Sequence, residues 1–189
     1  MKRAVIVASG PSLTQEDVDH IKDKAFVIAI NESYRMCPWA DVLYACDLTW
    51  WNYRKGVKEF DGKKYTIDYL ASQKFNLIHV PSQRCDFIIG EKYISVGRNS
   101  GYQALSIAAN MGFKEIILLG FDYGFGLKTH WHGDHPQGMH HNHIDFDGWN
   151  AEMEKAASKL KEASIRVINC SRETSIKCFE RMSVFDIIE

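Results

Sequence analysis

A cluster of histidines in the second half of the chain is its most chemically suggestive feature. Six of the eight histidines lie between residues 130 and 143, with an aspartate among them. Imidazole is a common ligand of transition metals and a common general base near neutral pH. The cluster is therefore compatible with a metal site, with a single catalytic base, or with a solvated loop whose histidines are incidental. Its members are His130, His132, Asp134, His135, His140, His141 and His143.

The two functional alternatives use this cluster differently. A metal site would gather His130, His132, Asp134 and His135 around a divalent ion such as Zn²⁺ or Mn²⁺. General-base catalysis needs one residue that deprotonates an acceptor hydroxyl group, and our candidates are His135 and His132. Inverting transfer requires only that base and a stabilised leaving phosphate, so this hypothesis needs the fewest assumptions. No cofactor is certain, and Mg²⁺, Mn²⁺ and Zn²⁺ all stay open.

Polar residues recur where apolar segments end. We expect strands at 3–8, 25–30, 41–46, 115–120 and 165–168, separated by helical segments at about 14–22, 102–111 and 149–163. Such alternation is typical of an α/β protein with a mainly parallel sheet covered on both faces. Ligands of these sheets bind beyond the carboxyl ends of the strands. The residues expected at that edge are Ser9, Gly10, Asn31, Asp47, Asp122 and the segment 169–171.

Two of the loops at this edge combine a glycine with the start of a helix, which suits an anion. The first is Ser9-Gly10-Pro11-Ser12, where Ser12 is expected to cap the helix together with Gln15. The second is Arg98-Asn99-Ser100-Gly101, where a cation precedes the helix. Neither loop is a Walker A motif or a GxGxxG fingerprint. A P-loop kinase and a Rossmann dinucleotide site are therefore both disfavoured.

Two acidic residues at the expected edge have several conceivable roles. Asp47 is followed by Trp50 and Trp51, whose rings would either stack on a base or sugar or pack at the rim. Asp122 follows Gly120 after the most strand-like run of the chain. Its carboxylate would bind a metal or a hydroxyl group, serve as a base, or simply hold its loop.

Length and composition indicate one domain over residues 1–189, with a His-rich loop at 123–147 and a short closing helix at 183–188. Between residues 65 and 89 the sequence shows short apolar pieces and no clear helix. A net charge of −1 argues against a broad surface for nucleic acid or for an anionic membrane. The short apolar run after the N-terminus and five scattered cysteines favour a cytoplasmic protein with reduced thiols. A homo-oligomer is an option.

Several segments resemble a known group of transferases. VIVASGPSL, AINESY and SGYQALSIAANMGFKEIILLGFDYG together resemble the bacterial α-2,3-sialyltransferases of the Campylobacter type and the related MptE-like family, which includes pterin diphosphokinases. The closing segment VINCSRETSIKCFERMSVFDII is similar to the same wider group. PWADVLYACDLTWW and HWHGDHP resemble small bacteriophage and prophage proteins.

This resemblance implies a single Rossmann-like (GT-A-like) domain that binds a nucleotide or a nucleotide-sugar. The family's GxGPSL turn matches the loop 9–12, although its first glycine is Ala8 here. The resemblance also implies that Asn31 touches the nucleotide and that Ser100-Gly101 lies against the donor with Arg98 nearby. Gly120 and Asp122 match a GxD motif. A histidine of the following loop, His135 or a neighbour, would be the catalytic base.

The chain departs from the family after its third strand. The sialyltransferases carry an Asn-Pro-Ser segment there, whereas this chain has Ala45-Cys46-Asp47. A carboxylate at position 47 would repel the carboxylate of sialic acid and would suit a metal instead, so CMP-sialic acid is a doubtful donor.

The sequence thus favours a nucleotide-sugar-dependent glycosyltransferase acting on a small-molecule or glycan acceptor in the cytosol of a bacterium or phage-infected host. One alternative keeps the fold but performs Mg²⁺-dependent pyrophosphate transfer from ATP, with Asp47 and Asp122 holding the metal. Another is a phage-encoded, non-catalytic nucleotide-binding protein. Glycosylation of DNA bases is a fourth option that lacks the expected basic stripe.

Overall fold

The computed structural model describes residues 2–124, 130–133 and 145–189. Within these residues the chain forms an eight-stranded sheet in the order β10-β9-β8-β1-β2-β3-β4-β5, and every pair of neighbouring strands is parallel. This confirms the predicted α/β, Rossmann-like fold. The strands are β1 (Arg3–Val7), β2 (Phe26–Ile30), β3 (Val42–Tyr44), β4 (Lys63–Thr66), β5 (Ile78–His79), β8 (Glu115–Leu119), β9 (Arg166–Asn169) and β10 (Glu180–Arg181).

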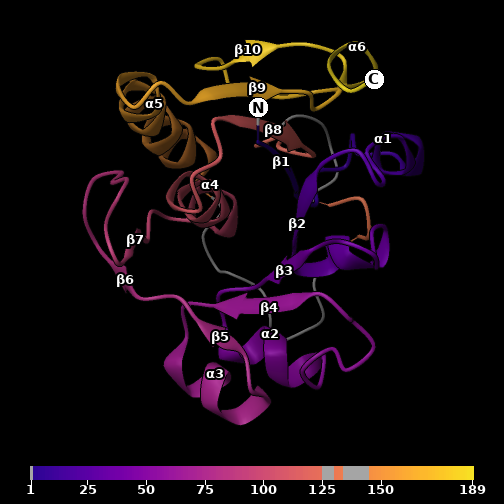
Figure 1. Ribbon diagram of the computed structural model, residues 1–189, viewed down its shortest axis with the longest axis vertical. Coiled ribbons are helices and arrows are strands. Elements are labelled where there is room, and N and C mark those ends of the chain that lie inside the picture. The colour runs from indigo at the N-terminus through magenta and orange to yellow at the C-terminus, as the bar shows by residue number, and fades with distance from the viewer. Residues whose placement is uncertain (1, 125–129, 134–144) are drawn as a thin grey trace.

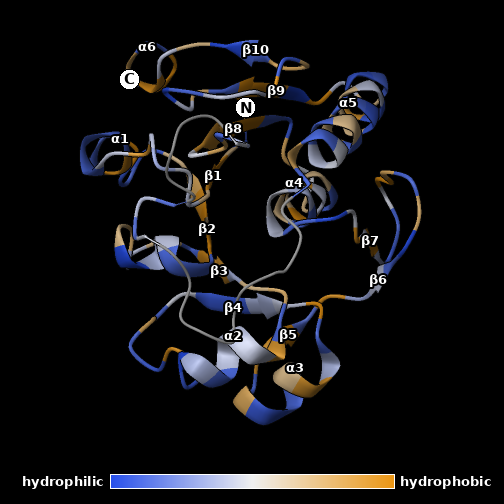
Figure 2. Ribbon diagram, turned by 180° about the vertical axis from the view of Figure 1, so that it is seen from behind, coloured by the Kyte–Doolittle hydropathy of each residue, from blue (hydrophilic) through white to orange (hydrophobic). Residues whose placement is uncertain are grey.

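Both faces of the sheet are covered, which explains why its central strands are continuously apolar. In β1, Ala4 and Ile6 belong to one buried cluster, whereas Val5 and Val7 belong to the other. Successive side chains of a strand point to opposite faces, so each strand contributes to two cores. Figure 1 shows the sheet from β10 to β5 with α4 and α5 on one side and α1 on the other. In Figure 2 the central strands β1 and β2 are mainly hydrophobic, whereas α1 is largely hydrophilic.

The helices divide between the two faces. Helices α4 (Ser100–Asn110) and α5 (Phe146–Glu162) contribute buried side chains to the cluster on one face. The cluster on the other face receives side chains from α1 (Gln15–His20), the 3₁₀ helix η1 (Asn31–Arg35), α2 (Leu48–Tyr53), α3 (Tyr69–Phe75) and α6 (Val184–Ile187).

The middle of the chain is more regular than the sequence indicated. Residues 63–79 form a complete strand–helix–strand unit, β4–α3–β5, that extends the main sheet. Asp68 caps α3 by accepting the N–H of Ala71 at 2.9 Å, and Asn76 ends it with a left-handed φ of 53°. The expectation of no helix in this region was wrong because α3 spans only two turns and is too short to show an apolar period. The short strands β6 (Ser82–Gln83) and β7 (Ile94–Ser95) pair separately.

The strand order shows where successive strands stop being added on one side of β1 and begin to be added on the other side. From β1 the sheet extends through β2 to β5, and from β8 it extends through β9 to β10. The reversal therefore lies between β1 and β8, the place where open α/β sheets have a crevice at the carboxyl ends of their strands.

The start of α1 differs from the sequence expectation. Thr14 is the N-cap, and it forms a capping box with Asp17: the side chain of each accepts the other's backbone N–H. Ser12 and Gln15 do not form the expected pair. The hydroxyl of Ser12 is bound to Asp122, and the amide of Gln15 donates to Asp19 and to the carbonyl of Met36.

Replacing Thr14 with Ala should therefore lower the free energy of unfolding by about 1 kcal/mol, the usual contribution of an N-cap. Gln15→Ala is the matched control, because it removes only exposed hydrogen bonds and should change stability by less than about 0.5 kcal/mol. Urea denaturation followed by circular dichroism measures both values. A larger loss in Q15A than in T14A would contradict the observed cap.

Candidate functional site

The loops after β1 and β8 are locked together by one carboxylate. Asp122 accepts the backbone N–H of Ser12 at 2.7 Å on one oxygen and the Ser12 hydroxyl at 2.8 Å on the other. Gly10 donates its N–H to the carbonyl of Gly120 at 2.8 Å. Burial raises the pKa of Asp122, and the two bonds from Ser12 oppose that rise.

These contacts reduce the number of N–H groups that the first glycine turn can offer to an anion. The N–H groups of Gly10 and Ser12 are bonded within the protein, and Pro11 has no N–H. Each oxygen of the buried Asp122 carboxylate accepts a hydrogen bond from Ser12, and this burial and pairing suit a structural role better than that of a base or a metal ligand. Within this turn, the hydroxyl of Ser9 is also in contact with the protein, because it lies near Nδ1 of His130.

Gly10 is required by this packing. A Cβ atom added at Gly10 would lie 2.5 Å from the carbonyl oxygen of Gly120 and would overlap the carboxylate of Asp122. Gly120 itself has a left-handed φ of 69°, a conformation that favours glycine. The two glycines therefore allow the ends of β1 and β8 to approach each other.

A short segment of the His-rich loop contacts the end of β1. Nδ1 of His130 lies 3.0 Å from the hydroxyl oxygen of Ser9, and Trp131 donates its backbone N–H to the carbonyl of Ser9 at 3.1 Å. The guanidinium of Arg35 lies 5.5 Å from the centre of the Trp131 ring. The rings of His130 and His132 stack with centroids 5.0 Å apart. The segment 130–133 thus brings two histidines of the predicted cluster to the carboxyl edge.

The end of β2 presents Asn31 in an unusual backbone conformation. Asn31 has a φ of 48° and is partly exposed at the first position of η1. The next residue, Glu32, is buried and accepts hydrogen bonds from Nε1 of Trp50 at 3.1 Å and from Nε of Arg54 at 2.7 Å. Left-handed non-glycine residues are uncommon and persist where their surroundings fix them. The Glu32 contacts to α2 supply that support.

The two tryptophans after Asp47 belong to the core. Trp50 and Trp51 are 3% and 0% exposed, and their rings pack edge to face at 4.9 Å. The possibility that they stack on a base or sugar was therefore wrong. Nε1 of Trp51 donates to the carbonyl of Ala45 at 3.0 Å, which ties α2 to the end of β3.

The end of β3 meets the start of α4. The thiol of Cys46 donates to Asp47 at 3.0 Å, and its sulfur lies 3.4 Å from the hydroxyl of Ser100. Burial raises the pKa of Cys46, so the group is a thiol and not a nucleophilic thiolate. Asp47 and Ser100 thus both contact the sulfur atom of Cys46, which is partly buried.

The N-terminus of α4 is capped by Asn99. Oδ1 of Asn99 accepts the N–H of Tyr102 at 2.9 Å and the hydroxyl of Tyr123 at 2.8 Å. Its Nδ2 is buried and has no partner among the described residues. A Cβ atom at Gly101 would lie 2.8 Å from the ring of Phe121, so this glycine permits close packing against the loop after β8.

Arg98 is bound within the protein. Its Nη1 donates to Oδ2 of Asp145, the N-cap residue of α5, whose Oδ1 accepts the N–H of Gly148 at 2.9 Å. The expected cation therefore lies beside the start of α4 with an internal carboxylate as its partner.

The metal hypothesis concerns residues that the structure describes only in part. Asp134, His135, His140, His141 and His143 lie outside the described residues. Among residues 2–124, 130–133 and 145–189, no group of three or more His, Cys, Asp or Glu side chains is arranged to hold a metal ion. The four-residue metal site and the assignment of His135 as base stay predictions.

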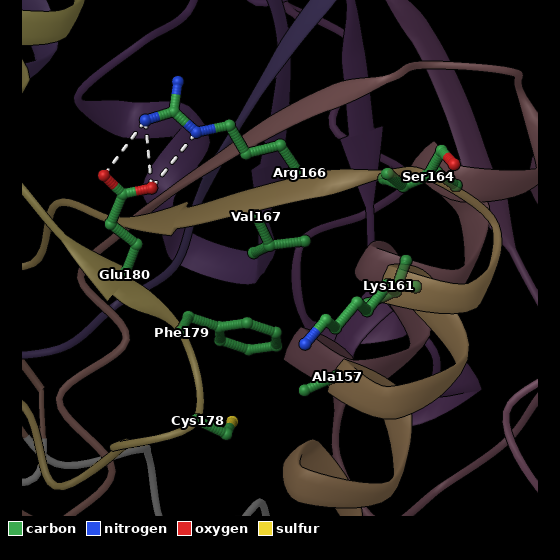
Figure 3. Close-up of a pocket in the computed structure, with 10 residues that line it drawn as sticks. Ala157, Lys161, Ser164, Arg166, Val167, Cys178, Phe179 and Glu180 are labelled. Atoms are coloured by element: carbon green, nitrogen blue, oxygen red, sulfur yellow. Dashed lines mark hydrogen bonds and ion pairs between the residues drawn. The ribbon is translucent and has the colours of Figure 1, made fainter.

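A surface pocket of about 410 Å³ lies elsewhere, between the C-terminal part of α5 and strands β9 and β10. Figure 3 shows Phe179, Val167 and Ala157 lining it, with Lys161 reaching across and Arg166 bound to Glu180. Arg166 begins β9, so the pocket lies at the amino ends of the strands. It is separate from the edge where the predicted site residues gather.

Comparisons with known proteins support the fold. No protein-family model matches the chain, and no curated protein matches it. A solved structure of the sialyltransferase CstII from Campylobacter jejuni, in complex with a substrate analogue, cytidine-5′-monophosphate, is similar with a TM-score of 0.59. The similarity covers 97% of this chain and 85% of that chain at 15% sequence identity. The chain therefore has a sialyltransferase-like, Rossmann-like fold. No helix in the described residues is long and apolar enough to cross a membrane.

Three contacts of the candidate site could not be found from the sequence. All three join positions far apart in the chain: Ser9 with His130, Trp131 with the carbonyl of Ser9, and Asp145 with Arg98. Only Asp145 carries a local signal, because an aspartate just before a helix is a common N-cap.

The packing between β1 and β8 yields a direct prediction. Gly10→Ala should reduce the free energy of unfolding by about 1–3 kcal/mol, because the new methyl group collides with backbone. Ser9→Ala, which removes an atom at the neighbouring position, should cost about 1 kcal/mol or less. Guanidinium denaturation compares the two. Equal stability of G10A and the wild type would show that the ends of β1 and β8 have room to separate.

Proposed function

We propose that the protein is a nucleotide-sugar-dependent glycosyltransferase that transfers a sugar to an acceptor hydroxyl group. The observation that carries this proposal is the gathering of polar groups at the carboxyl edge of a sialyltransferase-like sheet. Ser9, Asn31, Asp47 and Ser100 follow β1, β2 and β3 or begin α4, and the contact between Cys46 and Ser100 joins two of these elements. Such an edge is where α/β sheets bind nucleotides.

The donor would lie on the side of β2, β3 and α4. The contacts of Asp122 join the loops after β1 and β8 to each other. The ends of β2 and β3 and the start of α4 are therefore the part of the carboxyl edge that would face the ligand. In this arrangement Asn31 contacts the nucleotide, and Ser100 and Gly101 face its phosphate at the positive end of an 11-residue helix. The similar sialyltransferase was solved in complex with cytidine-5′-monophosphate, so a cytidine nucleotide is the first probe.

A histidine of the segment 130–133 would act as the base. The base takes the proton of the acceptor hydroxyl as that oxygen attacks the anomeric carbon, and the bond from this carbon to the nucleotide phosphate breaks with its electron pair leaving on the phosphate. Among the histidines that the structure describes, His130 contacts Ser9 in the loop after β1, and the ring of His132 stacks on that of His130. His135 remains a candidate beyond the described residues.

The identity of the sugar is constrained by charge. Asp47 stands at the end of β3, where the resemblance to the sialyltransferases implies a donor contact through an Asn. A carboxylate there repels the carboxylate of sialic acid, so we propose an uncharged sugar. Pyrophosphate transfer from ATP is less well supported, because Asp122, one of its two expected metal ligands, is buried and joins the loop after β8 to Ser12.

Nucleotide binding can be tested before any acceptor is known. Thermal unfolding would be followed with CMP, CDP, UDP, GDP, ADP and ATP and their sugar conjugates, each with EDTA, Mg²⁺, Mn²⁺ or Zn²⁺. A ligand at 100 times its dissociation constant stabilises by about 2.7 kcal/mol, a shift of several degrees. We expect one nucleotide family to stabilise the protein. Stabilisation by a metal alone would contradict the proposal and would indicate that the function depends on metal binding by the histidines.

The role of the base can then be separated from binding. With the stabilising donor, His130→Ala or His132→Ala should lower turnover by about 10²–10⁴-fold and leave donor affinity nearly unchanged. His20→Ala is the control, because His20 is the last residue of α1, away from the carboxyl edge, and contacts the carbonyl of Ile188. Unchanged turnover in both loop variants would rule out these histidines and leave those outside the described residues.

A further inference from the structure

The guanidinium of Arg98 forms an ion pair with a carboxylate of the protein itself. Nη1 of Arg98 donates to Oδ2 of Asp145. The other carboxylate oxygen of Asp145 accepts the N–H of Gly148 at 2.9 Å and so caps α5. One side chain thus serves a helix cap and an ion pair at once.

This ion pair joins the starts of two helices on one face of the sheet. Arg98 directly precedes Asn99, the N-cap of α4, and Asp145 is the N-cap of the 17-residue α5. Both helices contribute to the same core cluster and lie next to each other in Figure 1. Helix N-termini and a guanidinium all favour an anion, and in this structure that anion is Asp145.

The pair is also easy to exchange. The side chains of Arg98 and Asp145 are 55% and 42% exposed, and exposed pairs contribute little to stability. Next to Arg98, the buried Nδ2 of Asn99 has no partner among the described residues. A buried donor left unpaired is costly. An incoming anion with several oxygens would satisfy Arg98 and offer an acceptor close to this amide.

We propose that a phosphate group of the ligand replaces Asp145 on Arg98, so that Asp145 is a built-in competitor that sets the affinity for the donor phosphate. This inference rests on the proposed function and adds a residue to it. Asp145 leaves Arg98 when the phosphate binds and keeps its bond to Gly148, so α5 stays capped throughout the exchange.

Gly148 permits the pairing. A Cβ atom at this position would lie 2.8 Å from Nη1 of Arg98 and would overlap the carboxylate of Asp145. The guanidinium can therefore reach Asp145 only across a residue without a side chain. Gly148→Ala offers a way to separate the pair that changes no charge.

The test compares Asp145→Asn with Asp147→Asn. Asparagine caps a helix as well as aspartate does, so D145N removes the competing charge and retains the cap. D147N removes the same charge from an exposed residue two positions away. Calorimetric titrations would use inorganic pyrophosphate and CMP. We expect D145N to bind pyrophosphate about threefold to tenfold more tightly than the wild type, and D147N to differ by less than about twofold.

Two further variants complete the design. Gly148→Ala should tighten pyrophosphate binding, as D145N does. Arg98→Gln should weaken pyrophosphate binding, and adding D145N to it should cause no further change. Equal tightening in D145N and D147N would reduce the effect to general electrostatics and overturn the proposal. No change in D145N, with CMP bound by the wild type, would overturn the competition but leave the proposed function intact. Tightening for pyrophosphate without any nucleotide binding would support the exchange and contradict the proposed function.

Discussion

The bidentate contact between Asp122 and Ser12 is the interaction on which the arrangement of this protein depends. It joins the loops that follow β1 and β8, the two strands between which the sheet reverses its direction of growth. Because the carboxylate is buried, its desolvation is offset only by well-formed hydrogen bonds. Gly10 and Gly120 bring the two backbones close enough for these bonds to form. The switch point of the sheet is thereby closed by protein atoms.

Because protein atoms fill the switch point, the candidate site lies farther along the carboxyl edge of the sheet. The ends of β2 and β3 and the start of α4 remain as its open part, and each is held by polar contacts within the protein. Glu32 fixes the chain beyond Asn31 through Trp50 and Arg54, and Cys46 links Asp47 to Ser100. Rigid supports of this kind hold functional groups in place before a ligand arrives. The segment 130–133, bound to Ser9, adds two histidines to the same edge.

The sequence predicted the fold better than the contacts within the site. Long β-branched runs identified β1, β2 and β8 to within one residue, because burial on both faces leaves an unmistakable apolar pattern. The short helix α3 and the capping box at Thr14 were missed, since two turns carry little periodicity and several polar residues compete for a cap. The edge residues were found from their positions after strands, but their partners were not. That Asp122 binds Ser12 and that Trp50 is buried follow from tertiary packing, which no local pattern encodes.

Nucleotide binding at the carboxyl edge is the central claim, and hydrogen–deuterium exchange with mass spectrometry tests it most directly. The protein would be labelled alone and with CMP, UMP, GMP or AMP at millimolar concentration. The account predicts that one nucleotide slows exchange in peptides covering residues 31–35 and 98–102, at the ends of β2 and the start of α4. Protection confined to residues 157–167, which line the pocket at the opposite ends of the strands, would contradict it, as would unchanged exchange with every nucleotide.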